Sequence, residues 1–189
     1  MKRIVIFASG SGTNAENIIR YFKNHKSARV TLVLSNKENA GVFERCKNEQ
    51  ISCLYFKKSD FTNSETILNL LKKEADFIVL AGFLLKVPEN IIQAFRNKII
   101  NIHPALLPKY GGKGMYGMNV HKAVKDNGES ETGITIHFVN EYYDEGGIIF
   151  QVKTSVDGSD TPENIATKVH KLEYKHFPRV IEETLIKYA

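Results

Sequence analysis

Two polar side chains at the exit of an apolar run are the strongest candidates for chemistry in this sequence. Asn101 and His103 lie two residues apart in Asn101-Ile-His-Pro104, where the run 99–102 ends. Residues i and i+2 of a strand project to the same side, so we expect the two side chains to point together. The amide can donate to a developing oxyanion, and the imidazole can donate or relay a proton near neutral pH. The alternative is a capped strand end with a structural histidine.

An acidic stretch further along the chain could complete this pair. It contains Glu141, Asp144 and Glu145 between two predicted strands. A carboxylate close to His103 would raise the pKa of the imidazole, because it favours the imidazolium. Most carboxylates in such a loop face water, and the pattern alone does not select one of them.

A glycine-rich turn near the N-terminus predicts an anion site. Ser9-Gly-Ser-Gly-Thr-Asn14 separates the apolar run 4–8 from a helical pattern. Glycines let the backbone approach a ligand, and the free N–H groups at a helix N-terminus attract an anion. The spacing Gly10-x-Gly12-x-x-Ala15 also fits a relaxed dinucleotide fingerprint, but the second predicted strand lacks the acid that would hold a ribose. A phosphate loop is therefore favoured over a dinucleotide site or a plain tight turn.

The remaining candidates are weaker. His121 and His137 are interpreted as core residues or as supports for other site residues. The other histidines follow helical patterns and are expected to face solvent: His25, His170 and His176. No HExxH pair, CxxC pair or clustered acidic site occurs, so no metal is expected. The glycine-rich segment 109–118 is either a lid over a site or a surface excursion.

Short apolar runs alternate with helical patterns through the first half of the chain. The predicted strands are 4–8, 30–34, 53–56, 76–81 and 99–102, with helices from about residues 14, 42, 66 and 88. Residues 133–139 and 147–152 predict two further strands, and Thr161-Pro-Glu163 begins a long terminal helix. We therefore expect an α/β fold: an open, mostly parallel Rossmann-like sheet with helices on both faces and an antiparallel element near the C-terminal end.

Length and composition restrict the class of protein. The 189 residues fit one domain, and 42% hydrophobic and 25% charged residues are ordinary for a globular chain. The net charge of +5 suits an anionic ligand as well as RNA and decides neither. Cys46 and Cys53 cannot build a disulfide framework or a four-ligand zinc site. The apolar runs are shorter than the ~20 residues of a membrane span, so we expect a soluble protein of a reducing compartment.

Several segments together resemble the phosphoribosylglycinamide formyltransferase family, the folate-dependent enzymes of purine biosynthesis. The resemblance covers essentially the whole chain. Its segments are Ser9-Gly-Ser-Gly-Thr-Asn14, Ala81-Gly-Phe83, Asn101-Ile-His-Pro-Ala-Leu-Leu-Pro-Lys-Tyr110, Gly133-Ile-Thr-Ile-His-Phe-Val139 and Asp144-Glu-Gly-Gly-Ile-Ile-Phe-Gln151. The long segment from Asn101 with the one from Asp144 is typical of folate formyltransferases, and the Gly-Thr-Asn turn indicates the glycinamide ribonucleotide branch.

The resemblance implies transfer of the formyl group of 10-formyltetrahydrofolate to the amine of 5-phosphoribosylglycinamide, in de novo IMP biosynthesis and without a metal. It implies a cytoplasmic enzyme, monomer or homodimer, with small-molecule partners and neither nucleic acid nor membrane. Within a single domain 1–189, residues 1–100 would be the phosphate-binding half, and 101–189 the folate and catalytic half with the terminal helix.

The resemblance also implies roles for individual residues. The catalytic set would be Asn101, His103 and Asp144. The acceptor's phosphate and ribose would contact Gly12, Thr13, Asn14 and Glu173. The folate would lie against Leu84, Leu85, Lys86, Val87, Asn101, Asn140, Glu141, Tyr142, Tyr143 and Asp144.

Two alternatives stay open. One is a formyltransferase for another amine, such as a sugar nucleotide or methionyl-tRNA, or a hydrolase that releases formate. The tRNA and hydrolase types carry an additional domain, for which 189 residues leave no room. The other is a non-catalytic nucleotide-binding module, which would have no use for an amide paired with an imidazole. A formyl-transfer assay separates these readings.

Overall fold

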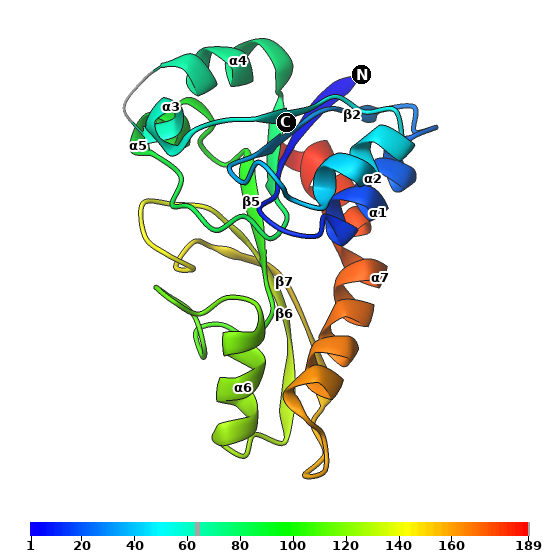
Figure 1. Ribbon diagram of the computed structural model, residues 1–189, viewed down its shortest axis with the longest axis vertical. Helices are drawn as coiled ribbons and strands as arrows, with labels where there is room; N and C mark the ends of the chain where they lie inside the picture. The colour runs from blue at the N-terminus through cyan, green and yellow to red at the C-terminus, as the bar shows by residue number, and fades with distance from the viewer. Residues whose placement is uncertain (63–64, 189) are drawn as a thin grey trace.

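The chain alternates strands and helices as far as His103 and then adds two antiparallel strands (Figure 1). The structure, a computed structural model, describes residues 1–62 and 65–188. The strands are β1 (Lys2–Phe7), β2 (Ala28–Ser35), β3 (Cys53–Tyr55), β4 (Phe77–Leu80), β5 (Ile99–His103), β6 (Glu131–Phe138) and β7 (Ile148–Ser155). The helices are α1 (Thr13–Phe22), α2 (Val42–Asn48), α3 (Lys58–Thr62), α4 (Thr66–Glu74), α5 (Glu89–Ala94), α6 (Met118–Asp126) and α7 (Pro162–Tyr188).

The strands form one mixed sheet in the order β3-β2-β1-β4-β5-β6-β7. The strands β1 to β5 run parallel to their neighbours, whereas β6 pairs antiparallel with β5 and β7 antiparallel with β6. The carboxyl ends of β1, β4 and β5 therefore meet at one edge, which is where open α/β sheets bind ligands. The predicted fold class, including its antiparallel element, is confirmed.

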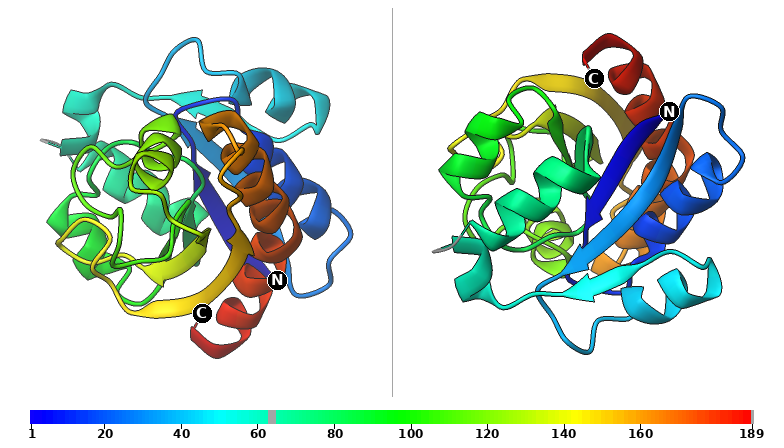
Figure 2. Two further views of the ribbon diagram at one scale, coloured as in Figure 1. Left: turned by 90° about the horizontal axis from the view of Figure 1, so that it is seen from below. Right: turned by 90° about the horizontal axis from the view of Figure 1, so that it is seen from above.

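Alternate residues of β1 build two separate cores. Ile4 and Ile6 pack in a cluster with α1, α2 and α7, whereas Val5 and Phe7 pack in a second cluster with α3, α4 and α5. Side chains of a strand alternate between the two faces, so a strand covered on both sides must be apolar at every position. Figure 2 shows α1 and α7 on one side of the strands and α4 and α5 on the other.

Two local details differ from the sequence prediction. The strand β5 extends through His103, because His103 pairs with Thr135 of β6. Pro88 lies at the N-cap of α5 with extended backbone angles, one position before the predicted first turn.

The terminal helix α7 runs along the first face of the sheet (Figure 1). It buries Ile165, Val169 and Phe177 against the strands, and it also buries the carboxylate of Glu173. Among residues 1–62 and 65–188, no helix combines the length and apolar character that crossing a membrane requires.

We expect Gly133→Ala to lower the free energy of unfolding by about 3 kcal/mol, because a side chain there overpacks the contact between β6 and β7. A Cβ atom at Gly133 would lie 2.0 Å from the carbonyl oxygen of Val152 and 2.9 Å from Cα of Lys153, which are backbone atoms. Gly158→Ala is the control, since a Cβ there has nothing within 4 Å. Chemical denaturation measures both, and equal stabilities of the two variants would contradict the expectation.

Candidate active site

A cavity of about 560 Å³ opens at the carboxyl ends of β1, β4 and β5. It brings together segments that are far apart in the sequence: the glycine turn after β1, the loop after β4, the exit of β5, the loop after β6 and α7. Its volume lies within the range of small-molecule sites. The predicted residues on its wall are Gly12, Thr13, Asn14, Leu84, Leu85, Lys86, Val87, Asn101, His103, Asn140, Tyr142, Tyr143, Asp144 and Glu173.

The glycine turn needs glycine at position 12. Gly12 is the N-cap of α1 and has a φ of 78°, in the left-handed region. A Cβ atom there would lie 2.6 Å from atoms of Val42 on α2. The backbone therefore passes close to α2 before α1 begins, and the first-turn N–H groups of α1 have no partner within the helix. This end of α1 is suited to an anion.

The hydroxyl of Ser9 connects this turn to the loop that follows β4. It donates to Oδ1 of Asn36 at 2.6 Å and accepts the N–H of Leu84 at 3.0 Å. The backbone N–H of Ser9 also donates to the carbonyl oxygen of Gly82 at 3.0 Å. Two walls of the cavity are thus held by one residue.

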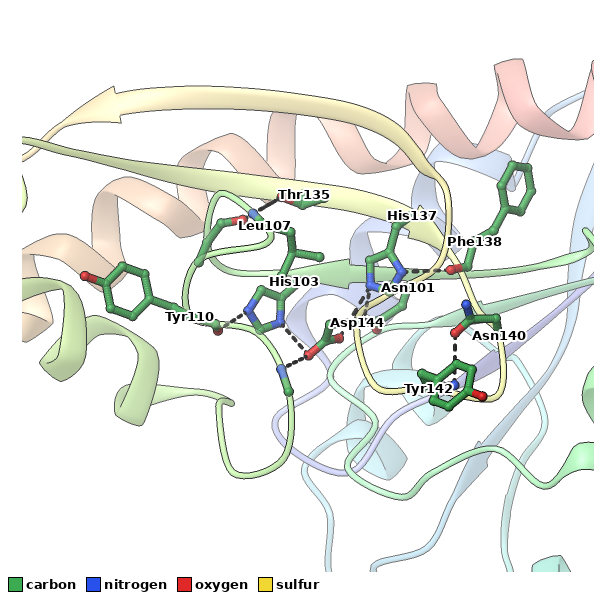
Figure 3. Close-up of polar contacts among 12 residues, drawn as sticks. Asn101, His103, Leu107, Tyr110, Thr135, His137, Phe138, Asn140, Tyr142 and Asp144 are labelled. Carbon is green, nitrogen blue, oxygen red and sulfur yellow. Dashed lines mark hydrogen bonds and ion pairs between the residues drawn. The ribbon is translucent and has the colours of Figure 1, made fainter.

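The turn after β5 holds His103 in place (Figure 3). Thr135 of β6 donates to the carbonyl oxygen of Ala105 at 2.7 Å and accepts the N–H of Leu107 at 3.0 Å. The chain then returns so that the carbonyl oxygen of Tyr110 lies 2.7 Å from Nε2 of His103. A carbonyl only accepts, so Nε2 of His103 carries a proton and donates it here.

The carboxylate of Asp144 faces the other ring nitrogen of His103 (Figure 3). Its Oδ2 lies 3.6 Å from Nδ1 of His103 and accepts the N–H of Gly112 at 2.9 Å. Burial lowers the pKa of His103, and the charge of Asp144 and the carbonyl of Tyr110 oppose that shift without reversing it. Both atoms that face the ring are acceptors, so they stabilise an imidazolium whenever a proton reaches Nδ1.

His137 connects Asn101 to the same carboxylate. Nδ1 of His137 donates to the carbonyl oxygen of Phe138 at 2.8 Å, so the neutral ring leaves a lone pair on Nε2. Nε2 lies 3.2 Å from Nδ2 of Asn101 and 3.5 Å from Oδ1 of Asp144. When the ring is neutral, the amide donates one N–H to this lone pair and keeps a second N–H for the cavity that Asn101 lines. When the ring carries a second proton, Nε2 donates toward Asp144 instead.

Asp144 remains a carboxylate although it is largely buried. Burial raises its pKa, but contacts with His137, His103 and the N–H of Gly112 outweigh burial, and the net shift of the pKa is downward. Its φ of 57° is unusual for a residue other than glycine. The loop after β6 is bent so that this side chain turns inward.

On α7, Glu173 lies at the opposite wall of the cavity, next to the glycine turn. Glu173 is 6% exposed. Its Oε2 accepts a hydrogen bond from Nδ2 of Asn14 at 2.8 Å and lies 3.0 Å from Nδ1 of His170. The Glu173 carboxylate raises the pKa of His170, against a smaller opposing effect of burial. A buried carboxylate with such partners can accept hydrogen bonds from hydroxyl groups of a ligand.

The mouth of the cavity is formed by the loops after β4 and β6. Leu84, Tyr142 and Tyr143 are exposed there, and Nζ of Lys86 lies 6.0 Å from the centre of the Tyr143 ring. Val87 is buried in the second core and anchors the loop after β4 to it. These loops offer apolar surface and backbone groups to a flat ligand.

Some predicted positions differ from what the structure places at the cavity. Glu141 is exposed and is not part of the wall, so its contact with the folate stays a prediction. His170 faces solvent as expected but also lines the cavity. His25 and His176 are half-buried, because they pack against Glu182 and Phe150 respectively.

The sequence reasoning missed the contribution of His170 and left those of His137 and the segment 109–118 open. His170 and Glu173 are three residues apart on a predicted helix, a spacing that places them side by side, and this signal was available. The segment 109–118 is not a plain surface excursion, since Gly112 to Met118 line the cavity. The contacts of His137 depend on the pairing register of β6, which the sequence does not show.

Comparisons with known proteins identify the family of this chain. A model of the formyl transferase family matches residues 2–181. The phosphoribosylglycinamide formyltransferase of Bacillus subtilis is 36% identical over 98% of this chain and 95% of that protein. The chloroplastic phosphoribosylglycinamide formyltransferase of Arabidopsis thaliana is 40% identical over 95% of this chain. The chain spans 64% of the Arabidopsis protein and 60% of the similar Vigna unguiculata protein.

Solved structures show the same fold. The phosphoribosylglycinamide formyltransferase of Bacillus halodurans superposes with a TM-score of 0.87 at 34% identity, over 100% of this chain and 97% of that one. The glycinamide ribonucleotide transformylase 1 of Geobacillus kaustophilus gives a TM-score of 0.88 at 34% identity, over 98% and 99% of the two chains. The family match spans the glycine turn, the strand that bears Asn101 and His103, and the loop of Asp144. The chain belongs to the formyl transferase family.

Proposed function

We propose that this chain transfers the formyl group of 10-formyltetrahydrofolate to the amine of 5-phosphoribosylglycinamide, releasing 5-phosphoribosyl-N-formylglycinamide and tetrahydrofolate for IMP synthesis. The observation that carries the proposal is the grouping of Asn101, His103 and Asp144 on a cavity that also reaches the glycine turn. The names of the relatives support the choice of acceptor. The reaction would take place in the cytoplasm, with the chain acting as a monomer or homodimer on small molecules.

The acceptor would occupy the half of the cavity between α1 and α7. The backbone N–H groups of Gly12, Thr13 and Asn14 would bind its phosphate, because the start of α1 concentrates unpaired donors and the positive end of the helix dipole. Glu173 would accept hydrogen bonds from the ribose hydroxyls, since its carboxylate is already held at this wall by Asn14. The amine of the acceptor would then point toward the exit of β5.

The folate would enter from the mouth of the cavity. Its pterin would lie between the loop Leu84, Leu85, Lys86 and Val87 and the loop that holds Asn140, Tyr142, Tyr143 and Asp144. Backbone groups of the two loops would pair with the edge of the pterin, and Leu84 and Tyr143 would cover its benzoyl part. The contact of Glu141 with the folate stays a prediction from the sequence alone, because Glu141 lies outside the cavity wall.

The proposed reaction is a direct transfer. The amine attacks the formyl carbon, a C–N bond forms, and the formyl oxygen becomes an oxyanion next to Asn101 and His103. The free N–H of the Asn101 amide and the His103 imidazolium stabilise this charge. Asp144 favours the imidazolium, so His103 can take part in moving the amine's proton to the departing folate nitrogen as the old C–N bond breaks.

The direct test follows tetrahydrofolate release by absorbance. With 10-formyltetrahydrofolate and 5-phosphoribosylglycinamide we expect continuous release, since both halves of the cavity are then filled. Water alone and a sugar-nucleotide amine serve as competing acceptors. Faster release with either of them would replace the proposed acceptor, and affinity for phosphate compounds without any turnover would favour the binding module.

We expect His103→Ala and Asp144→Ala each to lower kcat by about 10²–10⁴-fold, the range for loss of general acid–base catalysis. His176→Ala is a matched control, because His176 packs against Phe150 outside the cavity. Thermal unfolding of all three variants shows whether the fold is kept. Near-normal kcat in folded His103→Ala and Asp144→Ala would defeat the assignment.

Removing the charge of Asp144 should lower the pKa of His103 further below its ordinary value, since that charge opposes the effect of burial. NMR titration of the histidine ring resonances in Asp144→Asn and in the unmodified chain measures this shift. The His176 resonances should titrate identically in both. A His103 pKa that stays constant or rises in Asp144→Asn would show that the carboxylate does not support the imidazolium.

A further inference from the structure

One buried ring on the cavity wall has no role in the reaction described above. His121 lies in the first turn of α6, is 2% exposed and lines the cavity. Its Nδ1 is buried without a hydrogen-bond partner, which in residues 1–62 and 65–188 is true of only one other side-chain atom, Oγ1 of Thr132. A buried polar atom without a partner costs free energy, so its retention calls for an explanation.

The other ring nitrogen of His121 reaches the cavity. Within the part of the chain that the structure describes, Nε2 of His121 has no hydrogen-bond partner, and it is not among the buried unpaired atoms. It is therefore open to the space that the ring lines. An orphaned buried N–H is rarer in proteins than an unpaired acceptor, so the proton belongs on Nε2 and the lone pair on Nδ1. His121 thus presents one N–H donor to a ligand.

The neighbours of His121 place this donor at the acceptor half of the cavity. The rings of His121 and His170 meet edge to face with their centres 6.4 Å apart. His170 contacts Glu173, and Glu173 contacts Asn14 of the glycine turn. A ligand that spans the glycine turn and Glu173 therefore lies within reach of α6.

The ring of His121 is neutral at pH 7. Burial lowers the pKa of His121 to about 4, with a further lowering from His170 and His103 that Glu173 only partly offsets. A neutral donor binds an oxygen without adding charge to a half of the cavity that already contains the positive end of α1 and the Glu173 carboxylate.

We propose that His121 is a binding residue for the acceptor substrate, donating its Nε2–H to an oxygen of the phosphoribosyl group. This proposal rests on the proposed function for the identity of the acceptor. The hydrogen bond pairs Nε2, and Nδ1 keeps its buried lone pair. It makes the ring a determinant of specificity, because a ligand without an oxygen at this place leaves the Nε2–H unpaired.

Three substitutions of His121 separate the donor from the shape of the ring. Gln places its amide N–H near the position of Nε2, Asn places it near Nδ1, and Phe fills the volume without a donor. We expect His121→Phe and His121→Asn to raise KM for the acceptor about tenfold, the equivalent of one lost hydrogen bond. His121→Gln should recover KM to within about threefold, and kcat and KM for the folate should change less than threefold in every variant.

Calorimetry with ribose 5-phosphate provides a readout that does not depend on turnover. Its affinity should fall about tenfold in His121→Phe and be recovered in His121→Gln, while His176→Phe serves as the control outside the cavity. Thermal unfolding confirms that each variant is folded. If the unmodified chain binds ribose 5-phosphate but transfers no formyl group, the proposed function fails while this contact is still tested by binding.

Several results would overturn the proposal. Wild-type affinity in folded His121→Phe would show that no hydrogen bond is made. An equal loss in His121→Gln and His121→Phe would show that an N–H near the position of Nε2 is not what the ligand requires. A rise confined to KM for the folate would place the contact in the other half of the cavity.

Discussion

The burial of one carboxylate organises the candidate active site. A buried charge persists only where polar groups replace the water it has lost. For Asp144 these groups are the N–H of Gly112 and, when they carry a second proton, the rings of His103 and His137, which come from different parts of the chain. The segment after β5 and the loop after β6 are therefore fixed against each other by the same side chain. Gly146 belongs to this arrangement as well, because a Cβ atom there would lie 1.7 Å from the carbonyl oxygen of Phe138.

The reversal of strand direction at β6 makes this convergence possible. Antiparallel pairing sets Asn101 directly opposite His137 and His103 opposite Thr135. Side chains at opposed positions lie close together, so two alternate pairs of this ladder supply the amide, the imidazole and the groups that orient them. The parallel strands contribute the glycine turn and the loop after β4, and the antiparallel strand β6 contributes His137 and leads into the loop that carries Asp144.

Much of this arrangement could be predicted from residues alone, and the rest required tertiary information. Unbroken apolar runs such as that of β4 predicted strands covered on both faces, and the i, i+2 spacing predicted that Asn101 and His103 project together. The choice of Asp144 over Glu141 came from resemblance to a family, because loop carboxylates look alike in sequence. The pairing of His137 with Asn101 depends on register, and the inward position of His121 depends on how α6 packs beside α7. Neither property is encoded within one local segment.

The small bridge at Ser9 has a mechanical consequence. A single hydroxyl joins the backbone of the Leu84 loop to the end of β2 through Asn36, and it belongs to the turn that precedes α1. Displacement of the glycine turn or of the Leu84 loop is transmitted to the other segment through these hydrogen bonds of Ser9. The glycine turn and the loop after β4 are thus coupled, and a change in sequence that remodels one of them must preserve or replace these bonds to leave the other undisturbed.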